Sequence, residues 1–223
     1  MKKLSLVVLI SGSGSNLQAI IDAIRNGELN AEIRAVISNR AGAGGLQRAE
    51  KAGIATHIIE HNHYPDRESF DHAMIDVIDP LQPDLVILAG FMRILSPAFI
   101  EHFKHRLLNI HPSLLPKYRG LNTHQQAIDS NDDWHGASVH FVNVELDSGP
   151  LVIQTEVPVT KDDTAETLAA RVLQQEHKIY PLAIKLYGEG KLRFDNDTLL
   201  YEGRPLTSPL RLKDNRLIMP DHV

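Results

Sequence analysis

An alternation of apolar runs with amphipathic stretches over residues 4–111 is the feature that most constrains the fold. Five apolar runs have the length and composition of strands, at residues 4–10, 32–38, 55–59, 84–89 and 107–111. Helical spacing of apolar residues follows the first four of them, after residue 16 and at residues 43–51, 67–78 and 96–103. Strands that alternate with helices in this way predict a parallel sheet with right-handed crossovers, covered by helices on both faces.

The pattern changes after about residue 134. Two further strands are predicted at residues 136–144 and 151–157, and the short connection between them favours an antiparallel hairpin. A long helix follows over residues 164–187, in which Pro181 is expected to introduce a kink. We therefore predict an α/β protein with a Rossmann-like, doubly wound, mostly parallel sheet that is extended by a C-terminal antiparallel hairpin. Residues 1–190 are expected to form a single domain, and residues 191–223 an edge hairpin and a loose C-terminal tail.

Composition excludes several classes of function. The chain has no cysteine, so disulfides, thiolate nucleophiles and iron–sulfur ligation are absent. The net charge of −5 provides no basic field for a nucleic-acid backbone, and no run approaches the roughly 20 apolar residues of a membrane span. Residues 1–10 are interpreted as the first strand and not as a signal peptide, because a polar loop follows them. We expect a cytoplasmic protein without nucleic-acid or membrane partners.

A loop rich in glycine and serine, at residues 11–16, joins the first strand to the first helix. Backbone N–H groups at a helix N-terminus favour an anion, so Gly14, Ser15 and Asn16 are the candidates for phosphate binding. The dinucleotide fingerprint is incomplete because Leu17 replaces its third glycine, although NADP binding through Arg40 stays open. The loop suits a lone phosphate monoester, and the alternative is a purely structural turn.

Residues 107–113 suggest acyl-type chemistry. Pro112 ends the strand, and strand alternation places Asn109 and His111 on one face at its carboxyl end, where open α/β sheets bind ligands. An amide can donate to a developing oxyanion, and a histidine can transfer a proton near neutral pH. Asp147, in the turn of the predicted hairpin, is interpreted either as a turn former or as an acid that faces His111 and raises its pKa. The alternative for residues 107–113 is an ordinary strand end with a polar loop.

The histidines do not form a convincing metal site. A catalytic zinc ion usually needs three protein ligands, and neither His61 with His63 nor His102 with His105 has a supporting third ligand nearby. We interpret these four side chains as solvated surface and expect no metal.

Four motifs in matching order closely resemble the glycinamide ribonucleotide formyltransferases of purine biosynthesis, also called phosphoribosylglycinamide formyltransferases. They lie at residues 11–18, 89–95, 109–116 and 136–142 with 146–149, and the resemblance runs from about residue 4 to residue 190. It implies an enzyme that transfers a formyl group from 10-formyltetrahydrofolate, as co-substrate, directly to the glycyl amine of glycinamide ribonucleotide. Both substrates are small molecules, no metal is needed, and we expect a monomer or a homodimer.

The resemblance also implies roles for individual residues. Asn109, His111 and Asp147 would form the catalytic trio, acting through a tetrahedral intermediate. Substrate binding would use the phosphate-binding residues Gly14, Ser15 and Asn16, with Glu176 at the ribose. The folate would be bound by Asn109 together with Arg67, Met92, Arg93, Ile94 and Leu95.

Three alternatives stay open beside this interpretation. Formyltetrahydrofolate hydrolases carry a similar trio, but with an additional N-terminal regulatory domain. Methionyl-tRNA formyltransferases share residues 109–116, and residues 118–120 resemble them, but that family adds a C-terminal barrel domain and binds an RNA that the acidic charge disfavours. A phosphate-binding or NADP-binding Rossmann protein explains the glycine loop but not the trio.

Overall fold

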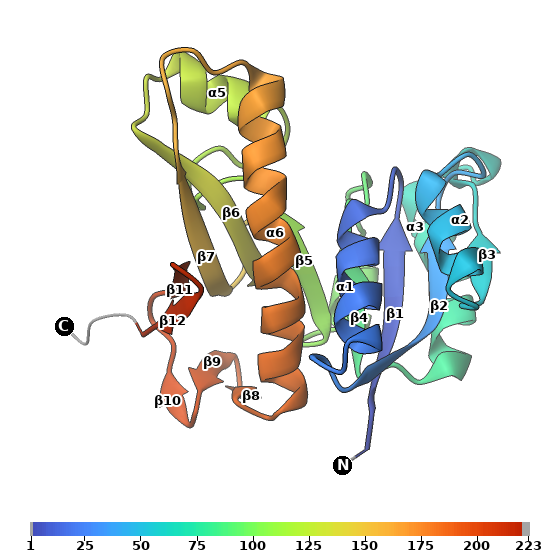
Figure 1. The fold of residues 1–223 in the computed structure, drawn as a ribbon. Coiled ribbons are helices and arrows are strands. Elements are labelled where there is room, and N and C mark those ends of the chain that lie inside the picture. The colour runs from blue at the N-terminus through green and yellow to red at the C-terminus, as the bar shows by residue number, and fades with distance from the viewer. Residues whose placement is uncertain (1, 220–223) are drawn as a thin grey trace. The chain divides into compact units, whose positions relative to one another are not determined.

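The computed structural model describes residues 2–219, which fall into two compact units that divide after Asn109. The first unit contains a parallel sheet whose strands are drawn from blue to green in Figure 1. Its central strand β1 (Leu4–Ile10) pairs with β2 and β4, β2 pairs with β3, and β4 pairs with the first residues of β5. The other strands are β2 (Ala31–Ser38), β3 (Thr56–Ile58), β4 (Leu85–Leu88) and β5 (Leu107–His111).

Helices cover both faces of this sheet, with α1 and α2 on one face and α3 on the other (Figure 1). Strand β4 is buried along its whole length, as expected for a strand between two helical layers. The four helices are α1 (Ser15–Arg25), α2 (Gly44–Lys51), α3 (Arg67–Ile78) and α4 (Pro97–His102). Two short 3₁₀ helices lie at His61–His63 and Asp79–Leu81. The predicted alternation of strands and helices is confirmed, and the fold class with it.

The second unit is built on the predicted antiparallel hairpin. Strand β6 (Trp134–Phe141) pairs with β7 (Leu151–Pro158), and the long helix α6 (Ala165–Gly188) packs against both. Thr164 caps α6 through a reciprocal capping box, and the helix runs uninterrupted through Pro181. Strand β6 begins earlier than predicted, because Trp134 already pairs with Pro158. A short helix that sequence periodicity did not predict, α5 (Thr123–Asp129), precedes β6.

The C-terminal region is more ordered than the predicted edge hairpin and loose tail. A hairpin is present, in which β8 (Leu192–Asp195) pairs with β9 (Thr198–Tyr201). A third strand, β10 (Arg204–Pro205), pairs with the other edge of β9. The expectation of a loose tail is wrong for residues 210–218. There β11 (Leu210–Lys213) pairs in parallel with β7 and antiparallel with β12 (Arg216–Ile218). Burial of Leu210 stabilises this pairing. The rest of the predicted tail, residues 220–223, lies outside the described residues.

Candidate active site

The glycine loop of the first unit leads from β1 into α1. Gly14 has a φ of 72°, and a Cβ atom there would lie 2.5 Å from the Cα of Gly45, so only glycine fits this close approach. No side chain caps the N-terminus of α1, and its first turn contains no acidic residue. The partial positive charge of this helix end favours an anion, and phosphate binding by Gly14, Ser15 and Asn16 stays a prediction.

A second loop, residues 89–95, follows β4 in the same unit. Ser11 fixes its beginning: the Ser11 amide donates to the carbonyl of Gly90 at 3.2 Å, and the Ser11 hydroxyl accepts from the Met92 amide at 2.8 Å. Met92 and Ile94 are each 60% exposed although both are apolar, and Arg93 between them is exposed as well. Such a surface suits a ligand that is partly apolar and partly anionic.

The parallel arrangement brings these loops to one edge of the first unit's sheet. Strands β1, β4 and β5 run in the same direction, with Asn109 of β5 paired to Leu88 of β4, so Asn109 shares the carboxyl edge with both loops. Arg67 begins helix α3 in the same unit. The predicted phosphate-binding loop, the predicted folate loop and Asn109 thus lie at one sheet edge.

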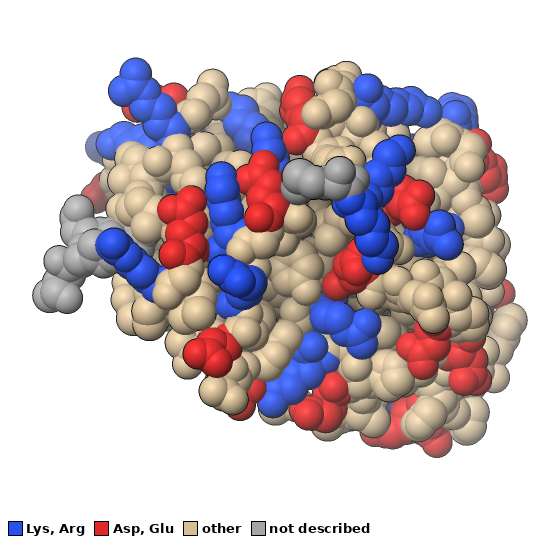
Figure 2. All heavy atoms as spheres, turned by 90° about the horizontal axis from the view of Figure 1, so that it is seen from below, with Lys and Arg blue, Asp and Glu red and all other residues tan. Residues whose placement is uncertain are grey.

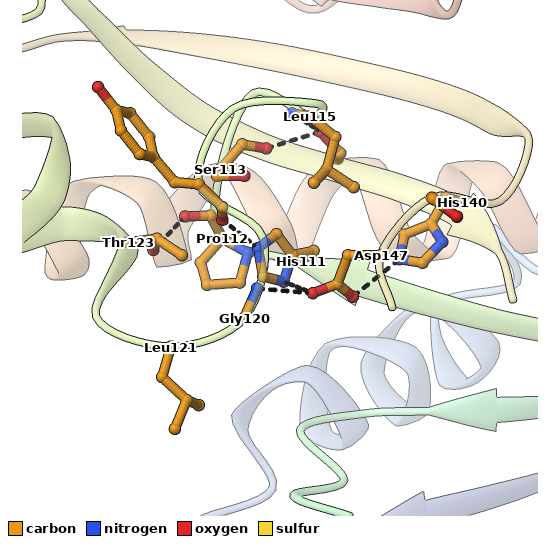
Figure 3. Close-up of polar contacts among 12 residues, drawn as sticks. His111, Pro112, Ser113, Leu115, Gly120, Leu121, Thr123, His140 and Asp147 are labelled. Carbon is orange, nitrogen blue, oxygen red and sulfur yellow. Dashed lines mark hydrogen bonds and ion pairs between the residues drawn. The ribbon is translucent and has the colours of Figure 1, made fainter. Parts of the chain in front are cut away.

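In the second unit the structure brings together His111 and Asp147, which are far apart in the sequence. His111 ends β5 and is only 5% exposed, and its Nδ1 atom lies 3.4 Å from the Oδ2 atom of Asp147. Figure 3 shows the two side chains facing each other, with the amide of Gly120 donating to the same carboxylate at 2.9 Å. Of the two interpretations of Asp147, the partner of His111 is therefore the one that the geometry supports.

The second ring nitrogen of His111 is also engaged. Its Nε2 atom lies 2.8 Å from the carbonyl oxygen of Tyr118, and a carbonyl can only accept, so Nε2 carries a proton here. The nitrogen that faces Asp147 then carries a proton only in the imidazolium form. Burial lowers the pKa of His111 below its usual value, and the Tyr118 carbonyl and the Asp147 charge oppose this effect only in part. A buried imidazolium with a lowered pKa is a stronger acid than free histidine, which suits proton donation.

His140 of β6 completes the surroundings of Asp147. Its Nε2 atom lies 3.6 Å from the Oδ1 atom of Asp147, so two imidazoles flank one carboxylate (Figure 3). Burial alone would raise the pKa of Asp147, but hydrogen bonds from His140 and the Gly120 amide, with the charge of His111, hold it below its usual value. Asp147 therefore stays ionised. Sequence reasoning included His140 in a motif but gave it no role; a histidine between the apolar residues Val139 and Phe141 was the available signal.

Hydrogen bonds from neighbouring strands and loops hold residues 113–118, the segment that places the Tyr118 carbonyl against His111. The buried hydroxyl of Ser138 donates to the carbonyl of Ser113 at 2.6 Å and accepts from the amide of Leu115 at 3.1 Å. Gln154 of β7 donates to the Leu115 carbonyl at 2.8 Å, and the Tyr118 hydroxyl donates to Asp132 at 2.9 Å. Hydrogen bonds to β6 and β7 therefore fix the position of the group that occupies Nε2 of His111.

The remaining expectations concern Glu176, metals and membranes. Glu176 lies on α6 and is buried, at 7% exposure, which is uncommon for a carboxylate and compatible with a binding role. Among residues 2–219 there is no group of three or more His, Asp or Glu side chains placed to hold a metal ion. No helix in that range is both long and apolar enough to cross a membrane. Acidic and basic side chains are interspersed on the face shown in Figure 2.

Comparisons with known proteins agree with this geometry. The formyl transferase family model matches residues 4–184. The chain is 53% identical over 203 residues to the phosphoribosylglycinamide formyltransferase of Escherichia coli, covering 91% of this chain and 96% of that protein. It is 47% identical over 206 residues to the Haemophilus influenzae protein of the same name, covering 92% and 96%.

A solved structure supports the same assignment. The phosphoribosylglycinamide formyltransferase of Coxiella burnetii superimposes with a TM-score of 0.88 at 51% identity, covering 92% of this chain and 96% of that one. Likeness of this extent in both sequence and structure shows common membership, and the order of motifs predicted it. The chain belongs to the formyl transferase family, in the branch of the phosphoribosylglycinamide formyltransferases.

Proposed function

We propose that this protein transfers a formyl group from 10-formyltetrahydrofolate to the glycyl amine of glycinamide ribonucleotide, a step of purine biosynthesis. The observation that carries the proposal is the buried pair of His111 and Asp147, on a chain whose relatives bear the name of this enzyme. The reaction uses two small-molecule substrates, with the reduced folate as co-substrate, and needs neither a metal nor a covalent intermediate. The protein acts in the cytoplasm, as a monomer or a homodimer, without nucleic-acid partners.

The chemistry begins with attack of the neutral glycyl amine on the formyl carbon. A carbon–nitrogen bond forms, and the formyl oxygen becomes an oxyanion in a tetrahedral intermediate. Asn109 and protonated His111 donate hydrogen bonds to that oxygen, since strand alternation directs both side chains from β5 to the same face. The bond to N10 of the folate then breaks, and the proton lost by the attacking nitrogen passes to N10 through His111 or a water molecule.

The position of His111 defines what must change when substrate binds. Its Nε2 proton is directed at the Tyr118 carbonyl, so the formyl oxygen or a water molecule has to replace that carbonyl as the acceptor. Asp147 stays behind Nδ1, because its hydrogen bond from Gly120 holds it there. The carboxylate orients the ring and stabilises the imidazolium without accepting the proton itself.

Binding residues are assigned from the family motifs. Gly14, Ser15 and Asn16 hold the phosphate of the ribonucleotide, which the uncapped N-terminus of α1 supports, and buried Glu176 holds the ribose. Asn109 also contacts the folate. The other folate-binding residues are Arg67, Met92, Arg93, Ile94 and Leu95.

The test is a spectroscopic assay of 10-formyltetrahydrofolate consumption with and without glycinamide ribonucleotide. Consumption that requires the ribonucleotide, is lost in His111→Ala and persists in the exposed-histidine control His57→Ala is the expected result. Consumption without any acceptor would identify a hydrolase instead. The absence of consumption in both cases would refute formyl transfer and leave a phosphate-binding protein.

A further inference from the structure

A buried carboxylate lies behind the exposed loop at residues 89–95. Asp71 of α3 is 1% exposed, and its Oδ2 atom accepts a hydrogen bond of 2.5 Å from the backbone amide of Ser96. Its Oδ1 atom is buried and has no hydrogen-bond partner among residues 2–219. Burial raises the pKa of Asp71, although the hydrogen bond from the Ser96 amide opposes this effect. A carboxylate in this position is costly to bury, and its hydrogen bond goes to the backbone of Ser96, with the charge of Arg67 on the same helix also favouring its ionised form.

Ser96 is the point at which the loop ends and α4 begins. The Ser96 hydroxyl caps α4 by accepting from the amide of Phe99 at 3.2 Å, while its own amide is held by Asp71. The other end of the loop is fixed by Ser11, which binds both Gly90 and Met92. The loop is thus clamped on both sides of its exposed residues, by a serine at its beginning and by an aspartate at its end.

We propose that Asp71 is a positioning residue for the formyl donor. It holds the loop of residues 92–95 in the conformation that receives the reduced folate, and it does so from α3, the helix that carries Arg67 at its first position. The inference rests on the proposed function, in which this loop and Arg67 contact the folate. A loop whose two ends are fixed before binding loses less conformational freedom when the ligand arrives, so the clamp strengthens folate binding without contacting the folate.

A structural role alone would lower stability without distinguishing between the two substrates. Asp84 provides the matched control, because its carboxylate accepts a hydrogen bond of 2.8 Å from the backbone amide of Ser5 at the opposite end of β4. Asp84→Ala removes the same kind of bond from the same unit, away from the loop. Asp71→Asn keeps an oxygen that can accept from Ser96, whereas Asp71→Ala does not.

The experiment measures KM for each substrate, the melting temperature, and amide hydrogen exchange at residues 92–96 in the free protein. Asp71→Ala is expected to raise KM for 10-formyltetrahydrofolate about tenfold, because binding of the folate must then order the loop that the hydrogen bond from Ser96 to a charged group ordered beforehand. KM for the ribonucleotide stays unchanged, exchange in the loop becomes faster, and Asp71→Asn restores most of the wild-type behaviour. Asp84→Ala lowers the melting temperature but leaves KM for the folate and exchange in the loop unchanged.

Two results would overturn the inference. The first is an unchanged KM for the folate in Asp71→Ala, and the second is an equal rise in KM for both substrates with exchange no faster than in Asp84→Ala. Failure of the proposed function is recognised separately in the wild-type protein. That protein would then show no formyl transfer, and calorimetric titration with 10-formyltetrahydrofolate would give no heat of binding. In that event the positioning role falls as well, although faster loop exchange in Asp71→Ala would still report the clamp.

Discussion

Replacing Asp147 with asparagine removes one negative charge and almost no volume. The imidazolium of His111 lies 3.4 Å from the Asp147 carboxylate, and two unit charges at that separation attract by about 5 kcal/mol at an effective dielectric constant of about 20. The asparagine oxygen keeps a dipole that faces the ring, which retains roughly half of this energy, because interactions with an ionised partner are about twice as strong as those with a neutral one. A remaining loss of about 2.5 kcal/mol in stabilising the protonated ring corresponds to a roughly hundredfold lower kcat. Binding of either substrate changes much less, because the proposed binding residues do not include Asp147.

The assay is the steady-state rate of formyl transfer across the pH range, with NMR titration of the His111 ring. The pKa of His111 is expected to fall in Asp147→Asn, since the carboxylate is one of the groups that raise it. Asp129→Asn is the matched control, because Asp129 is an exposed acid on α5 outside the site. Unchanged turnover, or a rate loss that arises entirely from higher KM values, would remove Asp147 from the mechanism.

Three further predictions concern stability. Gly14→Ala should lower the free energy of unfolding, measured in urea titrations, by at least ~2 kcal/mol and by more than Gly27→Ala does. Both glycines have left-handed φ angles, but of the two only Gly14 lies against another backbone segment. Equal losses in the two variants would show that this close approach is unimportant. Burial, together with the neighbouring charge of His124, lowers the pKa of His135 to about 4. Between this pH and about 6.5 the unfolded chain binds a proton that the folded chain does not bind. The free energy of unfolding should therefore fall by about 3 kcal/mol as the pH drops from about 6.5 to about 4. His135→Phe should reduce the slope of this profile in denaturation curves measured over that range, leaving the part due to His111, whose pKa burial also lowers, and an unchanged slope would exclude His135 as a source. Ser138→Ala should cost about 2–3 kcal/mol through three lost hydrogen bonds; a loss no larger than in the exposed control Ser130→Ala would contradict the anchoring role of Ser138.

Local physical chemistry explains where the sequence prediction succeeded. Helix α3 spans the predicted residues 67–78, and Ser96 followed by Pro97 starts α4 as predicted, because apolar spacing and capping depend on neighbouring residues only. The same holds for Asn109 and His111, whose common direction follows from strand alternation. Family motifs added the pairing of His111 with Asp147, which neither periodicity nor composition could establish.

Contacts between distant segments could only come from the tertiary structure. Residues 210–213 look like tail in the sequence, yet they pair in parallel with β7, because a short segment becomes a strand when a neighbouring edge offers hydrogen bonds. No local sequence pattern relates the groups that interact in the site and behind the folate loop. These interactions are the contact of His111 with the Tyr118 carbonyl, the approach of His140 to Asp147 and the hydrogen bond from Ser96 to Asp71. The sequence by itself predicted the alternation of strands and helices up to β5 and proposed the catalytic groups, since both depend on short-range patterns and family motifs. The protonation, orientation and support of those groups were decided by the fold, because burial and hydrogen bonding exist only once distant residues have come together.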